Sequence, residues 1–342
     1  MSDKHYKVAE DVNKYPDAWC YLVVGGRSTG KTYNSLLDCI NNKRGFLFVK
    51  RTIKDVDNLC KRKKLNPFNK INLKEGRDIK VIPESDGFGY FIDEDENVVG
   101  YVGALTGLGK FTGFDLYDVD WIIFDEYIPR KWDRFMYSEG EMLLDLYFTV
   151  SRDRELEGRP PLKLICLANA TTLSNPVNDA LRITDSMAEM IADNKDILYI
   201  KDREIVIRML KHHEISEDLK HTAFYKGVSG TKFGAMAFDN EFSNDDFSQV
   251  NRSTLKGYRC KCSFVYQNIT YYVYKKGSYY YITKSPGNTN KHYDLDMTID
   301  QTSFYYDIGI DIRAALLERK SVFESFVTYD MILNYKKHYK IT

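Results

Sequence analysis

Residues 21–32 constrain the fold of this chain more than any other segment. An apolar run, Tyr-Leu-Val-Val, leads into Gly-Gly-Arg-Ser-Thr-Gly-Lys-Thr, so that four residues separate Gly25 from Gly30 and the pair Lys31-Thr32 follows at once. This is the spacing of a Walker A loop, which joins a buried strand to a helix through a glycine-rich turn. The pattern predicts an α/β fold, with a strand over residues 19–24 and a helix over residues 32–40.

The residue types in this loop indicate that it binds a nucleoside triphosphate. Backbone N–H groups can surround the phosphates, the Lys31 ammonium can reach the β- and γ-phosphates, and the Thr32 hydroxyl can ligate Mg²⁺. We therefore expect ATP to be bound by Gly25, Gly26, Arg27, Ser28, Thr29, Gly30, Lys31 and Thr32, with Lys31 also acting in catalysis.

A second motif, Asp125-Glu126, follows the apolar run at residues 121–124 and matches a Walker B strand with an added glutamate. Asp125 at a strand end can bind Mg²⁺ together with Thr32, and it completes the predicted ATP-binding set. Glu126 is then placed to orient and deprotonate a water molecule. A kinase must exclude that water, so Glu126 favours hydrolysis. The alternative is an ordinary acidic turn after a core strand.

Asn169 follows another apolar run, at residues 162–167. If that strand lies beside the Walker B strand, the Asn169 amide can contact the γ-phosphate or the attacking water and act as a catalytic sensor. The alternative is a turn-forming asparagine, because asparagine is common where a strand ends.

Two arginines, Arg152 and Arg154, lie between these strands in Ser-Arg-Asp-Arg. In ring ATPases an arginine from a neighbouring subunit commonly reaches the γ-phosphate, so both are candidate catalytic residues. The alternative is that both are surface arginines paired with Asp153 and Glu155.

Further apolar runs indicate a mainly parallel sheet. Residues 121–124 and 164–167 are continuously apolar, as in strands buried on both faces, and segments with helical spacing at 139–147 and 179–192 separate the strands. Short strands joined by polar turns predict an antiparallel insertion at a sheet edge over residues 79–105. The predicted strands are residues 19–24, 45–49, 79–82, 90–92, 98–105, 121–124 and 162–167.

The composition changes around residues 208–232, where Lys, His and Asp become frequent, and a tyrosine-rich tract follows. Alternating strands are expected at 262–266, 270–274 and 278–283, and helical character returns over 310–339. We therefore predict a P-loop ATPase domain over residues 1–207, a linker over 208–232 and a C-terminal domain over 233–342.

Charge is balanced over the whole chain, with 49 Lys and Arg and 49 Asp and Glu, but not along it. Residues 43–80 contain 13 basic side chains against four acidic ones. A basic segment on a neutral protein suits contact with a polyanion. The alternative is a solvated surface with scattered lysines.

Nothing in the sequence indicates a membrane protein. No apolar run approaches the roughly 18 residues of a membrane span, and the N-terminal residues lack the apolar core of a signal peptide. We expect no membrane partner and a cytoplasmic location, in which the six cysteines stay reduced.

Together these motifs resemble the DNA-packaging ATPases, or encapsidation motor proteins, of small tailed bacteriophages with protein-primed linear DNA. That family is related to large terminase subunits and other ring translocase ATPases, and Arg27 is similar to the terminase arginine four residues before the Walker lysine. The resemblance rests on residues 24–32, 123–126, 150–154 and 166–170, and continues through 232–236 and 238–242.

For the fold, the resemblance implies a P-loop ATPase of the additional-strand, catalytic-glutamate class with a mainly parallel central sheet. A smaller α+β domain resembling an inactive RNase H-like nuclease is expected to follow. A two-metal nuclease needs about three converging carboxylates, whereas this family packages unit-length genomes and needs no cutting. The acidic residues of the second domain are Asp239, Asp245, Asp246, Asp294 and Asp296.

For function, the resemblance implies an ATP-driven motor that translocates double-stranded viral DNA into an empty procapsid, using ATP and Mg²⁺. The implied partners are double-stranded DNA, the procapsid portal, a homo-oligomeric ring of five subunits and a scaffold RNA. The implied location is the host cytoplasm, transiently on the procapsid. By position, Glu126 matches the catalytic glutamate, Arg152 the trans-acting finger, Asn169 the polar residue after the strand, and Lys110 a lysine in a mobile loop that contacts DNA.

Other classes of protein share some or all of these motifs. A cellular helicase, translocase or clamp-loader-like ATPase shares all of them. A P-loop kinase shares the Walker A loop, although Glu126 argues against it. A nucleotide-binding switch without turnover is the remaining alternative.

Overall fold

The computed structural model describes residues 5–107, 116–129, 136, 138–210, 218, 220–231, 234, 242 and 245–341. The chain divides into two compact units. Unit 1 consists of Met1–Leu181 and Met190–Asn244, and unit 2 of Arg182–Glu189 and Asp245–Thr342. Strand β9 (Ile205–Leu210) belongs to the sheet of unit 1, although the sequence suggested that a linker begins at residue 208.

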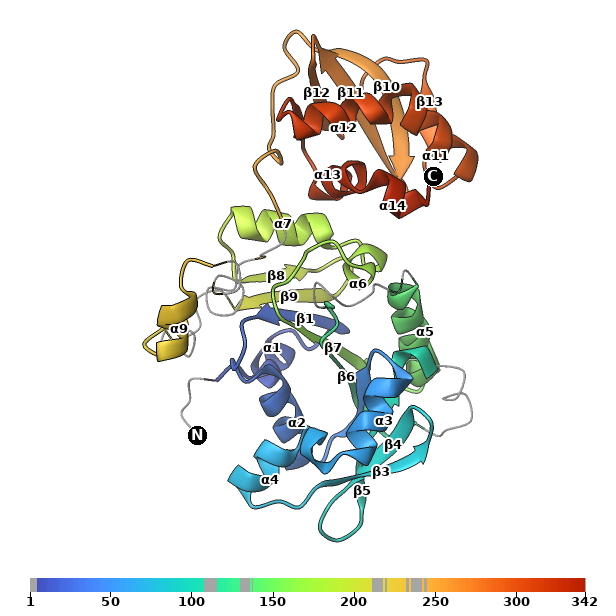
Figure 1. The fold of residues 1–342 in the computed structure, drawn as a ribbon. Coiled ribbons are helices and arrows are strands. Elements are labelled where there is room, and N and C mark those ends of the chain that lie inside the picture. Colours follow the sequence, from blue (N-terminus) through green and yellow to red (C-terminus); the bar gives the residue numbers. More distant parts are fainter. Residues whose placement is uncertain are drawn as a thin grey trace. The chain divides into compact units, whose positions relative to one another are not determined.

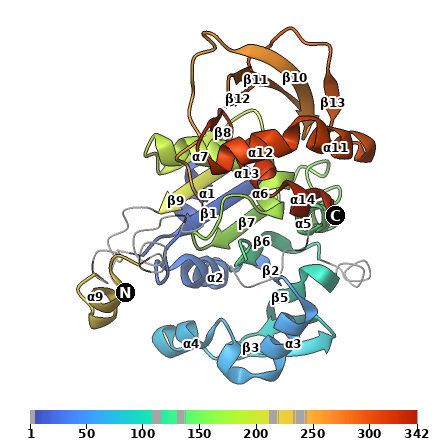
Figure 2. The same ribbon diagram turned by 45° about the horizontal axis from the view of Figure 1, so that its top comes forward.

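A mainly parallel sheet forms the centre of unit 1 (Figures 1 and 2). Within the described residues it has nine strands in the order β3-β4-β5-β2-β6-β7-β1-β9-β8. The strands from β5 to β9 are parallel, whereas β4, β3 and β8 pair antiparallel at the two edges. The other bounds are β1 Cys20–Gly25, β2 Gly45–Lys50, β3 Lys80–Ser85, β4 Phe88–Ile92, β5 Val98–Ala104, β6 Val119–Asp125, β7 Lys163–Ala168 and β8 Ile197–Ile200.

The continuous apolar runs correspond to the central strands, which confirms the predicted parallel sheet. Every residue of β1 and of β7 is buried, because helices cover both faces of a parallel sheet. The antiparallel insertion at a sheet edge is also confirmed: β3, β4 and β5 form a meander, and β5 then pairs in parallel with β2.

The helices α1 to α4 cover one face of this sheet. Apolar residues from all four pack with alternate residues of the strands in one core cluster, which includes Val12, Leu36, Val56 and Ile71. The intervening strand residues are buried on the other side. The bounds in unit 1 are α1 Val8–Lys14, α2 Lys31–Asn41, α3 Ile53–Lys61, the 3₁₀ turn η1 Lys63–Leu65, α4 Asn69–Glu75, α5 Glu139–Ser151, α6 Pro176–Ala180 and α9 Ala223–Val228.

The sequence predicted one helix over residues 179–192, and this predicted extent is wrong. It is divided into α6 and α7 (Thr184–Ala192). Arg182 between them has a positive φ of 49°, which interrupts helical geometry. Apolar spacing continues across this break, which is why the sequence pattern did not show it.

Unit 2 packs helices against a smaller sheet. Its strands, in the described residues, have the order β13-β10-β11-β12-β14. Strands β10, β11 and β12 lie where strands were predicted, and they pair antiparallel. In its core the Phe304 ring contacts the rings of Phe264 and Tyr335. The bounds are β10 Arg259–Tyr266, β11 Ile269–Lys276, β12 Tyr279–Thr283, β13 His292–Asp294, β14 Ser321–Phe323, α11 Thr298–Phe304, a π-helical turn Tyr305–Gly309, α12 Ile310–Leu317, α13 Phe326–Leu333 and α14 Tyr335–Tyr339.

Two searches of the described residues bear on wider function classes. In that part of the chain no helix is both long and apolar enough to cross a membrane. In the same residues no group of three or more His, Cys, Asp or Glu side chains could hold a metal ion, and Asp239 lies outside them. All six cysteines are free thiols.

Candidate nucleotide-binding site

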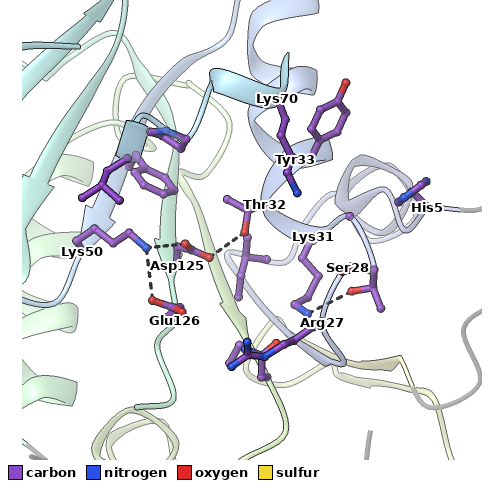
Figure 3. A pocket seen from close by; sticks show the side chains of 18 of the residues that line it. His5, Arg27, Ser28, Lys31, Thr32, Tyr33, Lys50, Lys70, Asp125 and Glu126 are labelled. Atoms are coloured by element: carbon purple, nitrogen blue, oxygen red, sulfur yellow. Dashed lines mark hydrogen bonds and ion pairs between the residues drawn. The ribbon is translucent and has the colours of Figure 1, made fainter. Parts of the chain in front are cut away.

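A cavity of about 610 Å³ opens beside the carboxyl ends of the parallel strands (Figure 3). Ligands of open α/β sheets bind at this edge, because the loops after the strands diverge there. Its lining combines the Walker A residues 27–32 with Asp125, Glu126 and Asn169. The three motifs, which are far apart in the sequence, therefore lie together in one place.

Gly30 allows the Walker A loop to turn into α2. It has a φ of 89°, which favours glycine, and a Cβ there would lie 2.9 Å from the Cβ of His5. The N-terminal segment supports this turn: the Tyr6 backbone N–H donates to the Thr29 carbonyl at 3.0 Å, and Asn34 Nδ2 donates to the Tyr6 carbonyl at 2.7 Å. The loop is thus held in shape by residues outside the motif.

Lys31 lies across the loop and contacts its carbonyl oxygens. Its Nζ donates to Gly25 O at 3.0 Å, to Gly26 O at 2.7 Å and to Thr29 Oγ1 at 3.2 Å. Burial lowers the pKa of Lys31 to about 8, against the opposing effect of the Asp125 carboxylate. A phosphate in the loop would give this buried ammonium the anionic partner that carbonyls do not supply.

Asp125, the last residue of β6, lies opposite Thr32 at the start of α2. The Thr32 hydroxyl donates to Asp125 Oδ1 at 2.9 Å (Figure 3). Mg²⁺ takes oxygen ligands and is usually held by one or two protein groups together with substrate phosphates and water. The Thr32 hydroxyl and the Asp125 carboxylate fit this donor set.

Lys50, the last residue of β2, is a site residue that the sequence reasoning missed. Its Nζ lies 2.7 Å from Asp125 Oδ2 and 3.7 Å from Glu126 Oε2 (Figure 3). Although burial disfavours its charge, these two carboxylates raise the pKa of Lys50 above its usual range. The signal was a lysine directly after the apolar run at residues 45–49, which becomes informative only once β2 is known to pair with β6.

Glu126 has a φ of 59°, which is unusual for a residue with a side chain. Such left-handed backbone costs about 1–3 kcal/mol and persists where the surrounding structure fixes it. The residue after it is held by β7, because the Tyr127 backbone N–H donates to the Leu167 carbonyl at 3.2 Å. The turn directs the Glu126 carboxylate to the cavity beside Lys50.

Asn169 follows β7, which lies between β6 and β1 as the sensor hypothesis required. It lines the nucleotide cavity and also an adjoining cavity of about 710 Å³. The two cavities share Lys50, Asp125, Glu126 and Asn169. Glu126 and Asn169 can therefore also be approached through a cavity that none of the described Walker A residues lines.

Arg154 is held inside its own unit. It is 7% exposed, and its guanidinium donates to the Pro160 carbonyl at 2.6 Å, to the Val119 carbonyl at 2.8 Å and to the Asp120 carboxylate. These contacts support a structural role for Arg154 in this chain, with Asp120 as its partner in place of Asp153 or Glu155.

Arg152, two residues earlier, is exposed and directly follows α5, with a φ of 40°. The Arg154 contacts place this segment at the first residues of β6, whereas Asp125 is the last residue of that strand. Six residue steps of about 3.3 Å give about 20 Å between the two ends. Arg152 therefore does not reach the nucleotide cavity of its own chain.

Lys110, expected to contact DNA, lies outside the described residues. The basic segment forms β2, α3, η1 and α4, and Lys70 and Lys74 of α4 line the nucleotide cavity.

Known proteins resemble this chain in sequence and in fold. The family described as podovirus DNA encapsidation protein (Gp16) matches residues 5–303. The DNA packaging proteins of Bacillus phages PZA and phi29 are each 26% identical over 293 residues, which span 80% of this chain and 78% of theirs. A chain of the bacteriophage phi29 viral genome packaging motor assembly has a similar fold, with a TM-score of 0.66, 20% identity, and coverage of 98% of this chain and 100% of that one. Because the family match covers most of its length, this chain belongs to the podovirus DNA encapsidation proteins.

Proposed function

We propose that this protein is an ATP-hydrolysing motor that moves double-stranded DNA into a viral procapsid. The observation that carries the proposal is the convergence of Lys31, Thr32, Asp125, Glu126 and Asn169 on one cavity, in a chain of the DNA encapsidation family. The arrangement supports a P-loop ATPase of the catalytic-glutamate class, because the carboxylate after the Walker B aspartate faces the place where a γ-phosphate would lie.

In the proposed reaction, Glu126 accepts a proton from a water molecule as the water oxygen bonds to the γ-phosphorus. The bond between that phosphorus and the β–γ bridging oxygen breaks, and ADP and phosphate leave. Lys50 holds the Glu126 carboxylate beside Asp125, and the Asn169 amide orients the water or a γ-phosphate oxygen. Mg²⁺, held by Thr32 and Asp125 when bound, neutralises charge on the β- and γ-phosphates.

Lys31 changes partners in this reaction. In the free loop its ammonium donates to carbonyl oxygens, and we expect it to turn to the β- and γ-phosphates when ATP binds. Gly25 to Thr32 then surround the phosphates with backbone N–H groups.

Arg152 completes the site of a neighbouring subunit in a ring. Its distance from its own cavity and its exposure both support action in trans, whereas the three hydrogen bonds of Arg154 support the structural alternative for that residue. A trans-acting arginine contributes factors of about 10³ to 10⁵ in rate to related NTPases.

The proposed partners follow from the relatives, whose names describe DNA packaging and a viral genome packaging motor assembly. They are double-stranded DNA and the portal of the procapsid, in the host cytoplasm. A ring of five subunits, a scaffold RNA, DNA contact by Lys110 and an RNase H-like fold of the C-terminal unit remain proposals that rest on the family resemblance.

The test is the ATPase rate with and without double-stranded DNA. We expect duplex DNA to stimulate hydrolysis, and Glu126→Gln to abolish turnover while ATP still binds. Glu84→Gln, an exposed carboxylate on β3, is the matched control and should leave the rate unchanged. Hydrolysis at full rate without DNA would count against a motor, and transfer of phosphate to an acceptor other than water would indicate a kinase.

A further inference from the structure

Two surfaces of unit 1 have opposite charge and carry exposed apolar side chains. The first, called the basic rim, consists of Arg62, Lys63, Lys64, Leu65, Lys70 and Leu73. The second, called the acidic face, consists of Asp145, Phe148, Asp153, Glu155, Leu156 and Glu157. We propose that the basic rim of one copy of this chain docks on the acidic face of a second copy, and that this contact delivers Arg152 of the second copy to the nucleotide site of the first. The inference rests on the proposed function, in which Arg152 acts in trans.

The basic rim borders the nucleotide cavity. Leu65 lines both that cavity and the adjoining one, and Lys70 lines the first. Leu65 is 50% exposed and Leu73 is 85% exposed. In the described part of the chain, Arg62, Lys63 and Lys64 form no ion pair with a carboxylate. Whatever covers the open side of the nucleotide site therefore meets positive charge interspersed with leucine.

The acidic face surrounds Arg152. Asp145 and Phe148 lie on the exposed side of α5, which leads to Arg152 at its end. Phe148 is 74% exposed and Leu156, four residues beyond Arg152, is 88% exposed. Each offers a large apolar side chain that a second copy can cover.

The charge of the acidic face is not neutralised within the chain. Across the described residues, Asp145, Asp153, Glu155 and Glu157 form no ion pair. The neighbouring arginines are engaged elsewhere: Arg154 pairs with Asp120, and the Arg159 guanidinium lies 4.0 Å from the centre of the Tyr117 ring. Asp153 and Glu157 border a hollow of about 200 Å³ that Arg152, Arg154 and Arg159 also line, so the carboxylates left for the basic rim are those on its exposed border.

The two surfaces lie at opposite edges of the same sheet. The rim borders the cavity at the carboxyl ends of the strands, whereas the Arg154 contacts place the acidic face at the amino end of β6. Both views also show α4 and α5 well apart (Figures 1 and 2). The surfaces therefore do not meet within one copy. Two different surfaces on one subunit form a head-to-tail contact, which closes into a ring when the rotation allows it.

A second copy fits the basic rim better than DNA does. A phosphate backbone would meet the lysines but would leave Leu65 and Leu73 against a strongly polar surface, since nucleic-acid contacts are dominated by phosphate and charge. The acidic face supplies carboxylates for the lysines and also Phe148 and Leu156 for the leucines. This also gives the basic segment of residues 43–80 a protein partner in place of the polyanion considered from sequence.

The test exchanges charge between the two surfaces in the full-length chain. One variant carries Lys63→Glu and Lys64→Glu on the rim, and another carries Glu155→Lys and Glu157→Lys on the acidic face. We expect each to weaken self-association by at least about tenfold at about 50 mM salt, because like charges then face each other. The loss should shrink at about 1 M salt, where the Debye length is about 3 Å. Sedimentation velocity and the dependence of the ATPase rate on protein concentration are the two readouts.

Rescue is the decisive outcome. Combining all four substitutions in one chain should restore association and the ATPase rate, because opposite charges again meet at every contact. Mixing the two variants should restore association between unlike copies, although strict alternation does not close a ring of five. Asp95→Lys with Glu96→Lys, in the exposed turn between β4 and β5, is a matched reversal of charge and should change neither readout. Oxidation of a mixture of Leu65→Cys and Leu156→Cys subunits should give crosslinked dimers that neither variant gives alone.

Three results would overturn the inference: no self-association of the unmodified chain, no rescue by either combination, or a rim reversal that weakens binding of duplex DNA while association is unchanged. The last result would assign the rim to DNA. Failure of the proposed function looks different. Rescue of association without DNA-stimulated hydrolysis would contradict the proposed motor function and would still support the docking contact. DNA-stimulated hydrolysis that is insensitive to the charge reversals would contradict only the docking contact.

Discussion

The two ends of the parallel strands in unit 1, called here the carboxyl edge and the amino edge, differ in how their charged side chains are held. At the carboxyl edge, Lys50 pairs with Asp125, and Arg51 makes a 2.6 Å ion pair with Glu139, whose side chain is fully buried. At the amino edge, Arg152 is exposed, and the carboxylates around it have no ion-pair partner in the described residues. Lys50 and Arg51 at the carboxyl edge are thus paired within a single chain, whereas the amino edge, in the part of the chain that the structure describes, presents Arg152 and unpaired carboxylates to its surroundings.

This difference follows from the cost of holding charge. A buried charge is stable only when it is paired and hydrogen-bonded, so the proposed triphosphate site keeps its charged groups in place before a ligand arrives. A group that acts on another molecule must stay exposed until that molecule docks. The same strand, β6, ends in Asp125 at one edge and begins beside the Arg154 contacts at the other.

The strongest test of this contrast is Arg152→Ala. We expect it to lower the DNA-stimulated ATPase rate by about 10³-fold or more, because the γ-phosphate loses a positive charge from the neighbouring subunit. Mixing Arg152→Ala subunits with Lys31→Ala subunits should restore part of the activity, since an intact site then meets an intact arginine. If no mixture recovers activity, Arg152 acts within its own chain or only in structure.

Arg154→Ala should act on stability. It removes three hydrogen bonds and leaves the Val119 carbonyl and the Asp120 carboxylate without them, so we expect the free energy of unfolding to fall by about 2–3 kcal/mol. Arg152→Ala should change it by less than about 0.5 kcal/mol, as exposed side chains do. Urea unfolding followed by tryptophan fluorescence measures both. An equal loss in the two variants would erase the distinction between these arginines.

Lys50→Met tests whether the paired charges at the carboxyl edge position the catalytic groups. We expect kcat to fall about tenfold to hundredfold with a smaller change in KM, because Asp125 and Glu126 lose the ammonium that holds them side by side. Lys54→Met, an exposed lysine on α3, is the matched control. A fall confined to ATP affinity would show that Lys50 binds phosphate and does not position Glu126.

The smallest expected effect is a pH dependence of ATP binding. Because the pKa of Lys31 is lowered to about 8 in the free protein, the ammonium that binds phosphate is lost above that pH, and affinity should fall by up to about tenfold per pH unit. Lys31→Arg should remove the dependence, since arginine stays protonated. Calorimetric titration in buffers of different ionisation enthalpy should show proton uptake on binding above pH 8.

The same group affects folding with the opposite sign. Between pH values of about 8 and 10.5, Lys31 binds more protons in the unfolded chain than in the free folded protein. The free energy of unfolding of the ATP-free protein should therefore rise with pH across this window. Lys31→Met should remove that slope, and an unchanged slope would assign it to another group.

The sequence predicted that the Walker A loop, Asp125 and Asn169 meet at the carboxyl edge, because this part of the geometry follows from general rules. A Walker A loop fixes the strand and helix around it, and parallel strands bring Asp125 and Asn169 to the same edge wherever they lie in the chain. Asp125 and Asn169, which are 44 positions apart along the chain, were therefore placed together from two short motifs.

The amino edge was harder to predict because it depends on the direction of single side chains. Arg152 and Arg154 share their residue type and their neighbourhood, and only the positive φ after α5 turns one outward while the other contacts Asp120. Lys50 was missed for a related reason, since its significance depends on the pairing of β2 with β6, which no local pattern specifies. The break between α6 and α7 likewise depends on one backbone angle at Arg182.

Because the length of β6 separates these two edges, the proposed ring also has a direction. Each copy would accept Arg152 from one neighbour at its carboxyl edge and would present its own Arg152 to the other neighbour at its amino edge. A change in one copy would therefore be passed to one neighbour and not to the other. Successive firing events would then follow one another around the ring in a single order. A single copy that lacks Arg152 would stop hydrolysis at one known position, in the neighbour to which it would present that arginine.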